Sequence, residues 1–271
     1  MMRATRAEHL LSYAILAVAG AFALYPLALI ITTALRPDAV GAENGIAFSN
    51  FADAWDEGNF GRYLQNSVVV AVAVVVISAA VSSLAGYAFG TMRFRGSSVL
   101  FYLLLLGMMV PSEAIVIPLY FDLDSIGLTN TYAALILPQI AQSLAFGTFW
   151  MRAYFRSTSR DIVEAARMDG AGHLRVFWSI LLPMGRPALM TMVLLVFMWT
   201  WNEFLLPLVM LPNNEDLRTA PLGLSNFQGQ HTSGTALLAA GAVLVALPVV
   251  IVYLVTQRHF IRGMIEGAVK G

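Results

Sequence analysis

The sequence contains no cysteine, a single lysine (Lys270) and few charged residues of any kind, only 12% of 271. The absence of cysteine excludes disulfides, thiolate catalysis, iron–sulfur clusters and cysteine zinc sites. With one lysine and a formal net charge of zero, the chain lacks the basic patch that nucleic-acid binding requires. A Walker A loop is also excluded, because it needs a Gly-Lys-Ser/Thr string and Lys270 is followed by glycine.

Apolar residues are abundant instead. They make up 58% of the chain, against about 45–50% in an ordinary soluble domain. They gather in six runs of about 20 residues or more, the length that crosses a bilayer core. The runs cover residues 10–34, 67–90, 99–120, 131–155, 187–211 and 236–255. The first is too long for the apolar core of a cleaved signal peptide. The sequence therefore predicts an all-α integral membrane protein with six transmembrane helices.

Positive charges are divided unequally between the two sets of loops. Thirteen of the sixteen lie on one side: Arg3, Arg6, Arg93, Arg95, Arg152, Arg156, Arg160, Arg167, Arg175, Arg186, Arg258, Arg262 and Lys270. Because arginine and lysine are retained on the cytoplasmic side, both termini are predicted to be cytoplasmic. The predicted organisation is a cytoplasmic N-terminus (1–9), a transmembrane domain (10–257) that includes a cytoplasmic loop (156–186), and a cytoplasmic tail (258–271).

Small residues and prolines within the runs predict how the helices pack. Gly86 and Gly90 form a small-xxx-small pair that allows two helices to approach closely. Four prolines are expected to kink or interrupt their helices: Pro111, Pro118, Pro138 and Pro248.

The loop between the fourth and fifth runs predicts two short helices joined by a glycine turn. Asp161 is expected to cap the first helix, with Glu164 completing a capping-box-like pair, and Gly170 and Gly172 to end it. The second helix, over 173–182, is expected to place four apolar residues on one face: Leu174, Phe177, Trp178 and Leu181.

The same loop carries a specific pattern. Glu164-Ala165-Ala166 is followed after three residues by Gly170, after nine more by Ile180, and then by Leu182-Pro183. This pattern resembles the EAA loop of the integral membrane subunits of bacterial ABC importers. Other strings resemble the carbohydrate permeases of that group: Ala85-Gly86-Tyr87-Ala88-Phe89, Phe94-Arg95-Gly96, Ile117-Pro118-Leu119-Tyr120, Asp169-Gly170-Ala171, Trp201-Asn202-Glu203-Phe204 and Gly267-Ala268-Val269-Lys270-Gly271. The chain resembles the maltose-permease type, specifically the shorter, six-helix partner of the heterodimer.

The resemblance implies a type I ABC importer permease fold and a coupling helix that seats in a groove of a cytoplasmic ATPase. The implied coupling residues are Glu164, Ala165, Ala166, Met168, Asp169, Gly170, Ala171 and Gly172. A glutamate near a helix N-terminus suits an arginine of the partner, and the alanines permit close approach.

The resemblance also implies partners. They are a second related permease chain forming a heterodimer, two cytoplasmic ABC ATPase subunits, and an extracytoplasmic solute-binding protein that delivers a sugar. ATP and magnesium would be bound by the ATPases, and this chain would hold no cofactor and would not be an enzyme. The implied location is the cytoplasmic membrane of a bacterium or archaeon, in contact with membrane lipid.

Polar residues inside apolar runs are costly and are therefore candidates for a substrate pathway. The clearest set lies in the fifth run and consists of Trp199, Trp201, Asn202 and Glu203. Further candidates are Gln139 and Gln142 in the fourth run and Glu113 in the third. Amides and carboxylates bind sugar hydroxyls, and aromatic faces stack on sugar rings. For the set in the fifth run, pairing within the bundle and an interfacial tryptophan belt explain the residues as well as sugar contact does. For Gln139, Gln142 and Glu113, packing or hydrogen bonding between helices explains the residues somewhat better than sugar contact.

Other functions remain as alternatives. The chain could be an ABC permease for a non-sugar solute such as a glycerol phosphate, although no basic residue is visible in the spans. A self-sufficient carrier would not need the EAA-like loop. A membrane enzyme would need an aspartate, histidine or metal cluster, and the four histidines, His9, His173, His231 and His259, are isolated in the sequence, so no metal site is predicted.

Overall fold

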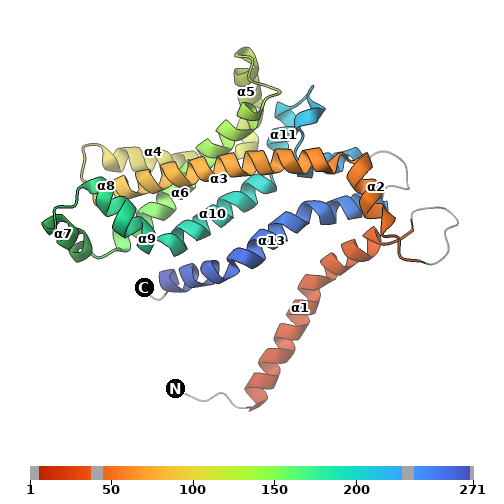
Figure 1. Ribbon diagram of the computed structural model, residues 1–271, viewed down its shortest axis with the longest axis horizontal. Coiled ribbons are helices and arrows are strands. Elements are labelled where there is room, and N and C mark those ends of the chain that lie inside the picture. The colour runs from red at the N-terminus through yellow and green to blue at the C-terminus, as the bar shows by residue number, and fades with distance from the viewer. Residues whose placement is uncertain (1–5, 38–44, 228–234, 269–271) are drawn as a thin grey trace. The chain divides into compact units, whose positions relative to one another are not determined.

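The structure is a computed structural model that describes residues 6–37, 45–227 and 235–268. Within these residues it consists of helices and connecting segments, with no strand, which confirms the predicted all-α class (Figure 1). Residues 1–5 of the predicted N-terminus (1–9) and residues 269–271 of the predicted tail (258–271) lie outside the described residues. So do His231, Arg3 and Lys270.

The chain divides into two compact units. The first comprises Met1–Gly61 and Gly223–Leu247, and the second comprises Arg62–Leu222 and Pro248–Gly271. In the first unit, α1 (Arg6–Ala34) exposes nearly all its apolar side chains between residues 9 and 31. The short helix α2 (Ser49–Glu57) is tied to the end of α1, because the Asn50 amide donates to the Ala34 and Arg36 carbonyls at 2.8 and 2.7 Å.

Helix α6 (Tyr132–Ser157) is the centre of the second unit. The helices α3 (Phe60–Thr91), α4 (Ser97–Met109) and α10 (Arg186–Trp201) all pack against it (Figure 1). Large side chains such as Leu135, Met151 and Met192 are fully buried in the core of the second unit.

The other elements of the described chain, in either unit, are α5 (Ser112–Ser125), α7 (Arg160–Met168), α8 (His173–Val176), η1 (Phe177–Leu181), α9 (Leu182–Met184), α11 (Leu205–Met210), η2 (Glu215–Leu217), α12 (Ala220–Gly223), η3 (Leu224–Phe227) and α13 (Thr235–Ala268).

Four helices are long and apolar enough to cross a membrane by themselves: α1 from His9, α3, α6, and α13 as far as Gln257. Two further candidates are bent pairs, α4 with α5 and the segment from α8 to α9 with α10, which would bring the number to six. The helices α1, α3 and α13 contain the predicted spans 10–34, 67–90 and 236–255, and α6 begins at Tyr132, one residue inside the predicted span 131–155.

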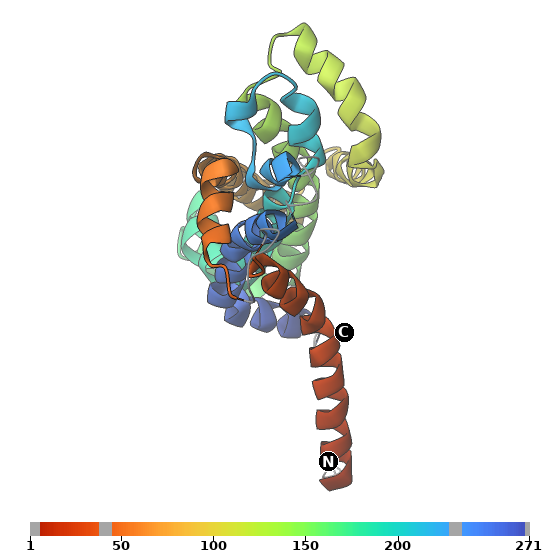
Figure 2. The same ribbon diagram turned by 90° about the vertical axis from the view of Figure 1, so that its right-hand side faces the viewer.

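The third predicted run, 99–120, is not one straight helix. Helices α4 and α5 meet at 97°, and Figure 2 shows α5 directed away from α4. Pro111 lies at the bend with an extended backbone (φ −65°, ψ 129°), because proline cannot continue the hydrogen-bond ladder of α4. By contrast, Pro118, Pro138 and Pro248 each lie inside a helix that continues past them, so these three do not interrupt their helices.

The fifth predicted run, 187–211, is also divided. Helix α10 ends at Trp201 and α11 begins at Leu205. The Asn202 side-chain amide donates to the Met198 carbonyl at 2.7 Å, and the Glu203 carboxylate accepts from the Leu206 backbone N–H at 2.9 Å. The Glu203 side chain satisfies a backbone N–H at the start of α11 that an unbroken helix would have satisfied internally. The Met198 carbonyl also accepts from the Asn202 backbone N–H at 3.2 Å, so the Asn202 side chain adds a second bond to a carbonyl that the helix already satisfies.

At the opposite end of the second unit from α7, a loop before α12 is fixed to the start of α3. The Asn66 amide donates to the Asp216 and Arg218 carbonyls at 2.8 and 2.9 Å, and the Asn66 carbonyl accepts from the Tyr132 hydroxyl at 2.6 Å. Arg62 forms an ion pair with Asp216. One buried asparagine therefore joins α3, α6 and the 215–218 segment.

Candidate functional site

Helix α7, which contains the EAA-like residues, begins two residues earlier than the sequence pattern suggested. Its N-cap is Ser159, whose hydroxyl accepts from the Asp161 backbone N–H at 3.2 Å. The predicted cap at Asp161 with Glu164 was therefore wrong. Ser159 has the extended backbone that an N-cap requires (ψ 134°), whereas Asp161 is already inside the helix.

The end of α7 is a glycine-dependent turn, as predicted. Gly170 has a left-handed backbone (φ +77°). The Ala171 N–H donates to the Ala166 carbonyl at 3.0 Å and the Gly170 N–H to the Arg167 carbonyl at 3.0 Å. This pair of bonds is a Schellman motif, which closes the helix and fixes the direction of the chain that follows. Gly172 instead caps the start of α8 with an extended backbone.

The segment after this turn differs from the predicted amphipathic helix. Phe177 and Leu181 are buried as expected, but Leu174 is 70% and Trp178 56% exposed. The buried face of this segment is formed instead by Val176, Phe177 and Leu181, and residues 177–181 form a π-helix.

Most of the predicted coupling residues form an exposed surface. Met168 is 88% exposed, and Glu164, Ala165, Asp169, Gly170 and Gly172 are exposed as well. Ala166 is buried and Ala171 is half-buried, so these two anchor the surface to the protein. A second anchor is Tyr87 of α3, whose hydroxyl donates to the His173 carbonyl at 3.2 Å.

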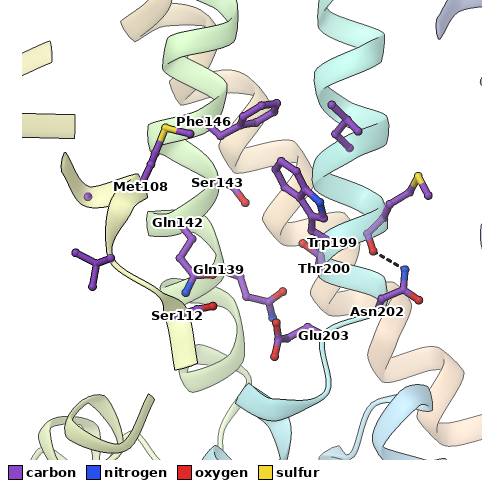
Figure 3. Close-up of a pocket in the computed structure, with 14 residues that line it drawn as sticks. Met108, Ser112, Gln139, Gln142, Ser143, Phe146, Trp199, Thr200, Asn202 and Glu203 are labelled. Carbon is purple, nitrogen blue, oxygen red and sulfur yellow. Dashed lines mark hydrogen bonds between the residues drawn. The ribbon is translucent and has the colours of Figure 1, made fainter. Parts of the chain in front are cut away.

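A cavity of about 630 Å³ lies beside the break between α10 and α11. Its walls come from α6, from the α4–α5 bend and from the end of α10 (Figure 3). It is lined by Gly107, Met108, Val110, Ser112, Gln139, Gln142, Ser143, Phe146, Leu195, Met198, Trp199, Thr200, Asn202 and Glu203. Five of the seven predicted pathway residues therefore share one cavity.

The polar side chains of this cavity come from facing helices. Glu203 and Gln142 reach it from opposite walls (Figure 3). Gln142 and Asn202 are exposed to the cavity, whereas Gln139 is buried and its amide donates to the Leu135 carbonyl at 2.9 Å. The Glu203 carboxylate oxygen Oε1 accepts from the Leu206 N–H of α11, so this side chain both lines the cavity and stabilises the start of α11.

The aromatic wall is formed by two rings. Trp199 is 51% exposed and meets Phe146 edge-to-face, with ring centroids 4.8 Å apart. Phe146 was missed in the sequence, although it lies four residues after Gln142 and therefore on the same helical face. Met108 and Thr200 were also missed, and Met108 lies at this site because α4 packs against α6.

Two predicted pathway residues lie elsewhere. Trp201 is 2% exposed, packs on Phe197 at 5.5 Å between ring centroids, and does not line the cavity. Glu113 lines a smaller adjoining cavity of about 40 Å³, which shares Gln142 and Glu203 with the larger one.

The charge of the larger cavity is slightly acidic. Its only ionisable lining residue is Glu203, and no arginine, lysine or histidine is among the described residues that line it. Within the described part of the chain, no group of three or more histidine, aspartate or glutamate side chains is placed to hold a metal ion.

A comparison with models of known protein families identifies the family of this chain. A model described as "Binding-protein-dependent transport system inner membrane component" matches residues 82–266, a range that holds both the loop around α7 and the cavity. The chain belongs to this family.

Relatives of this permease include several sugar transport proteins. It is 35% identical over 259 residues to the arabinooligosaccharides transport system permease protein AraQ of Halalkalibacterium halodurans, covering 92% of each chain. It is 32% identical over 257 residues to the trehalose transport system permease protein SugB of Mycobacterium tuberculosis, covering 92% of this chain and 93% of that one. It is 38% identical over 222 residues to the probable ABC transporter permease protein YurM of Bacillus subtilis, covering 82% and 73%.

A solved structure confirms the fold. The permease matches a chain of a bacterial ABC transporter involved in the import of the acidic polysaccharide alginate, with a TM-score of 0.79 and 25% identity. The match covers 96% of this chain and all of the other. The predicted type I importer permease fold is thereby confirmed.

Proposed function

We propose that this permease is the membrane subunit of an ATP-driven importer for a neutral sugar or oligosaccharide and forms half of the translocation pathway. The observation that carries the proposal is the cavity at the α10–α11 break, in which amide and carboxylate groups face an exposed tryptophan ring. Its relatives include permeases named for arabinooligosaccharide, diacetylchitobiose and trehalose transport.

The chemistry of the lining residues favours a polyhydroxylated solute. Gln142, Asn202 and Glu203 supply donors and acceptors for hydroxyl groups, and Trp199 supplies a flat apolar surface against which a sugar ring can stack. Binding sites of this kind combine an apolar lining with a few placed polar groups.

The charge of the cavity favours a neutral cargo over an anionic one. A glycerol phosphate or another anion would meet Glu203 without an opposing basic side chain among the described lining residues. An unpaired anion in a partly desolvated site is strongly disfavoured. The non-sugar alternative therefore has less support from this half of the pathway than the sugar.

The remaining parts of the system belong to the proposal. A second permease chain would complete the cavity, a solute-binding protein would deliver the sugar, and two ATPase subunits would bind ATP and magnesium. The ATPases would dock on the exposed face of α7 on the cytoplasmic side, with both termini on that side of the cytoplasmic membrane. Closure of the ATPase dimer would push α7 and change which side of the membrane the cavity faces.

The test is uptake by the complete transporter in proteoliposomes, with labelled maltotriose, arabinotriose, trehalose and glycerol 3-phosphate as cargoes. Gln142→Ala is expected to reduce uptake of the accepted sugar about tenfold, because one hydrogen bond to the moving sugar is lost. Gln65→Ala is the control, since Gln65 is also an exposed glutamine of the second unit but does not line the cavity.

Three results would overturn the proposal. They are uptake of glycerol 3-phosphate but of no sugar, equal uptake by the two glutamine variants, or full transport by this chain without any ATPase. The last result would make the protein a self-sufficient carrier.

A further inference from the structure

A second cavity, of about 770 Å³, lies at the other end of the second unit, where α3 and α6 end. Helix α7 forms one wall and the segment after α3 forms another. The lining residues are Gly90, Thr91, Met92, Arg93, Phe94, Phe155, Arg156, Thr158, Arg160, Val163, Glu164, Arg167 and His173. None of them lines the cavity assigned to the sugar.

The lining is strongly basic. Four arginines come from three different segments, against a single acid, Glu164. On α7 the lining residues are 160, 163, 164 and 167, which is one helical face. The three segments therefore place their positive charges around the same cavity.

These charges are not neutralised within the described part of the chain. The two ion pairs found there join Arg62 to Asp216 and Arg218 to Glu215, and neither involves an arginine of this cavity. Four guanidinium groups around one space repel each other, so an anion bound among them would be favoured. Planar guanidinium groups match the oxygens of a phosphate group and bind them in pairs.

The position of the cavity indicates where such a phosphate comes from. Thr91 and Arg156 line it, and they lie at the ends of two apolar helices, α3 and α6, that are long enough to cross a bilayer. Phe94 and Phe155 line it beside the arginines, which combines an apolar wall with a charged one. Basic pockets between membrane-spanning helices bind the headgroups of anionic phospholipids. The volume also exceeds what a single inorganic phosphate ion would fill.

We propose that this cavity binds the phosphate group of an anionic phospholipid headgroup. The site lies beside α7 but holds its ligand with residues of α3, α6 and α7 together. Lipid binding at this site does not depend on which solute is transported, so the proposal is independent of the proposed sugar cargo.

The test uses the complete transporter, purified in detergent and stripped of lipid, with bound phospholipid counted by native mass spectrometry. Dioleoyl phosphatidylglycerol is the probe, dioleoyl phosphatidylcholine the zwitterionic comparison, and inorganic phosphate the free-anion comparison. The double variant Arg93→Gln with Arg156→Gln removes two of the four charges without altering α7. The control is Arg95→Gln with Arg175→Gln, two exposed arginines that do not line the cavity.

The unaltered transporter and the control are expected to bind phosphatidylglycerol equally and in preference to phosphatidylcholine. The double variant is expected to bind it about 30-fold more weakly, because each arginine near anionic lipid contributes about a fivefold factor. The single variant Arg93→Gln is expected to show about a fivefold loss. It serves as the measurement should the double variant not assemble.

Several results would overturn the proposal. They include equal phosphatidylglycerol binding by the double variant and the control, or equal binding of phosphatidylglycerol and phosphatidylcholine. Inorganic phosphate that binds as tightly as the lipid would assign the site to a free anion. A double variant that loses its ATPase subunits while keeping its lipid affinity would assign the cavity to a protein contact.

Discussion

Gly86 of α3 and Met151 of α6 lie so close that a β-carbon on Gly86 would be 2.6 Å from the β-carbon of Met151. One turn further, a β-carbon on Gly90 would be 2.9 Å from that of Phe155. Real β-carbon contacts essentially never fall below 3.0 Å. The small-xxx-small pair predicted from the sequence is thereby confirmed as the contact that joins α3 to α6.

Gly86→Ala is expected to lower the stability of the permease by about 1–3 kcal/mol, because the added methyl group forces α3 away from α6. The measurement is the thermal unfolding midpoint of the purified complex in detergent. Gly20→Ala is the control, because nothing lies within 4 Å of a β-carbon at Gly20. An equal change in both variants would contradict close packing at Gly86.

Glu203 is expected to show a structural role that can be separated from its role in transport. Glu203→Ala removes the acceptor for the Leu206 N–H, which for a helix cap costs about 1 kcal/mol, whereas Glu203→Gln keeps an oxygen there. Thermal unfolding should therefore distinguish alanine from glutamine at this position. Uptake measured on the same samples shows whether the charge itself matters, since glutamine retains the cap without it. Equal thermal midpoints for the two variants would show that the carboxylate does not hold α11.

Glu164→Arg is expected to abolish recovery of the ATPase subunits when the tagged permease is purified, while the second permease chain is still recovered. The reason is that an exposed glutamate in the middle of α7 is replaced by an arginine, which would repel the arginine expected on the ATPase. Glu57→Arg is a matched control, because Glu57 is an exposed acid on α2, outside the EAA-like loop. Normal ATPase recovery with Glu164→Arg would remove this residue from the coupling surface.

Asn66→Ala is expected to destabilise the permease by about 3 kcal/mol, since three hydrogen bonds at a buried position are lost together. Limited proteolysis should then cut within 212–218 faster than in the unaltered protein. Gln65→Ala, an exposed neighbour on the same helix, should leave both readings unchanged. Unchanged proteolysis of Asn66→Ala would show that other contacts hold this segment.

Periodic and compositional features were predictable from the sequence. The long apolar helices, the glycine contact of α3 with α6 and the turn at Gly170 follow from local rules that a single sequence reveals. The EAA-like pattern led to the family because its residues are specified by type and spacing. These features depend on neighbours within one or two turns of the chain.

Features that depend on distant contacts were not predictable. At the break after Trp201, Glu203 satisfies the Leu206 backbone N–H, and a continuous apolar run gives no sign of this break. The segment 173–181 buries Val176, Phe177 and Leu181 in the core of the second unit, which leaves Leu174 and Trp178 on its exposed side. Met108 lies at the cavity on α4, which packs against α6, a helix distant from it in the sequence.

The bond from Tyr87 to the His173 carbonyl has a mechanical consequence for α7. The chain leads from α7 into α10 by way of α8 and α9, which gives one covalent route for a force applied to α7. Tyr87 adds a second route that enters α3 directly, one residue from the tight contact at Gly86. A displacement of α7 would therefore reach α10 along the chain and α3 through the bond from Tyr87 to His173, and both helices pack against α6.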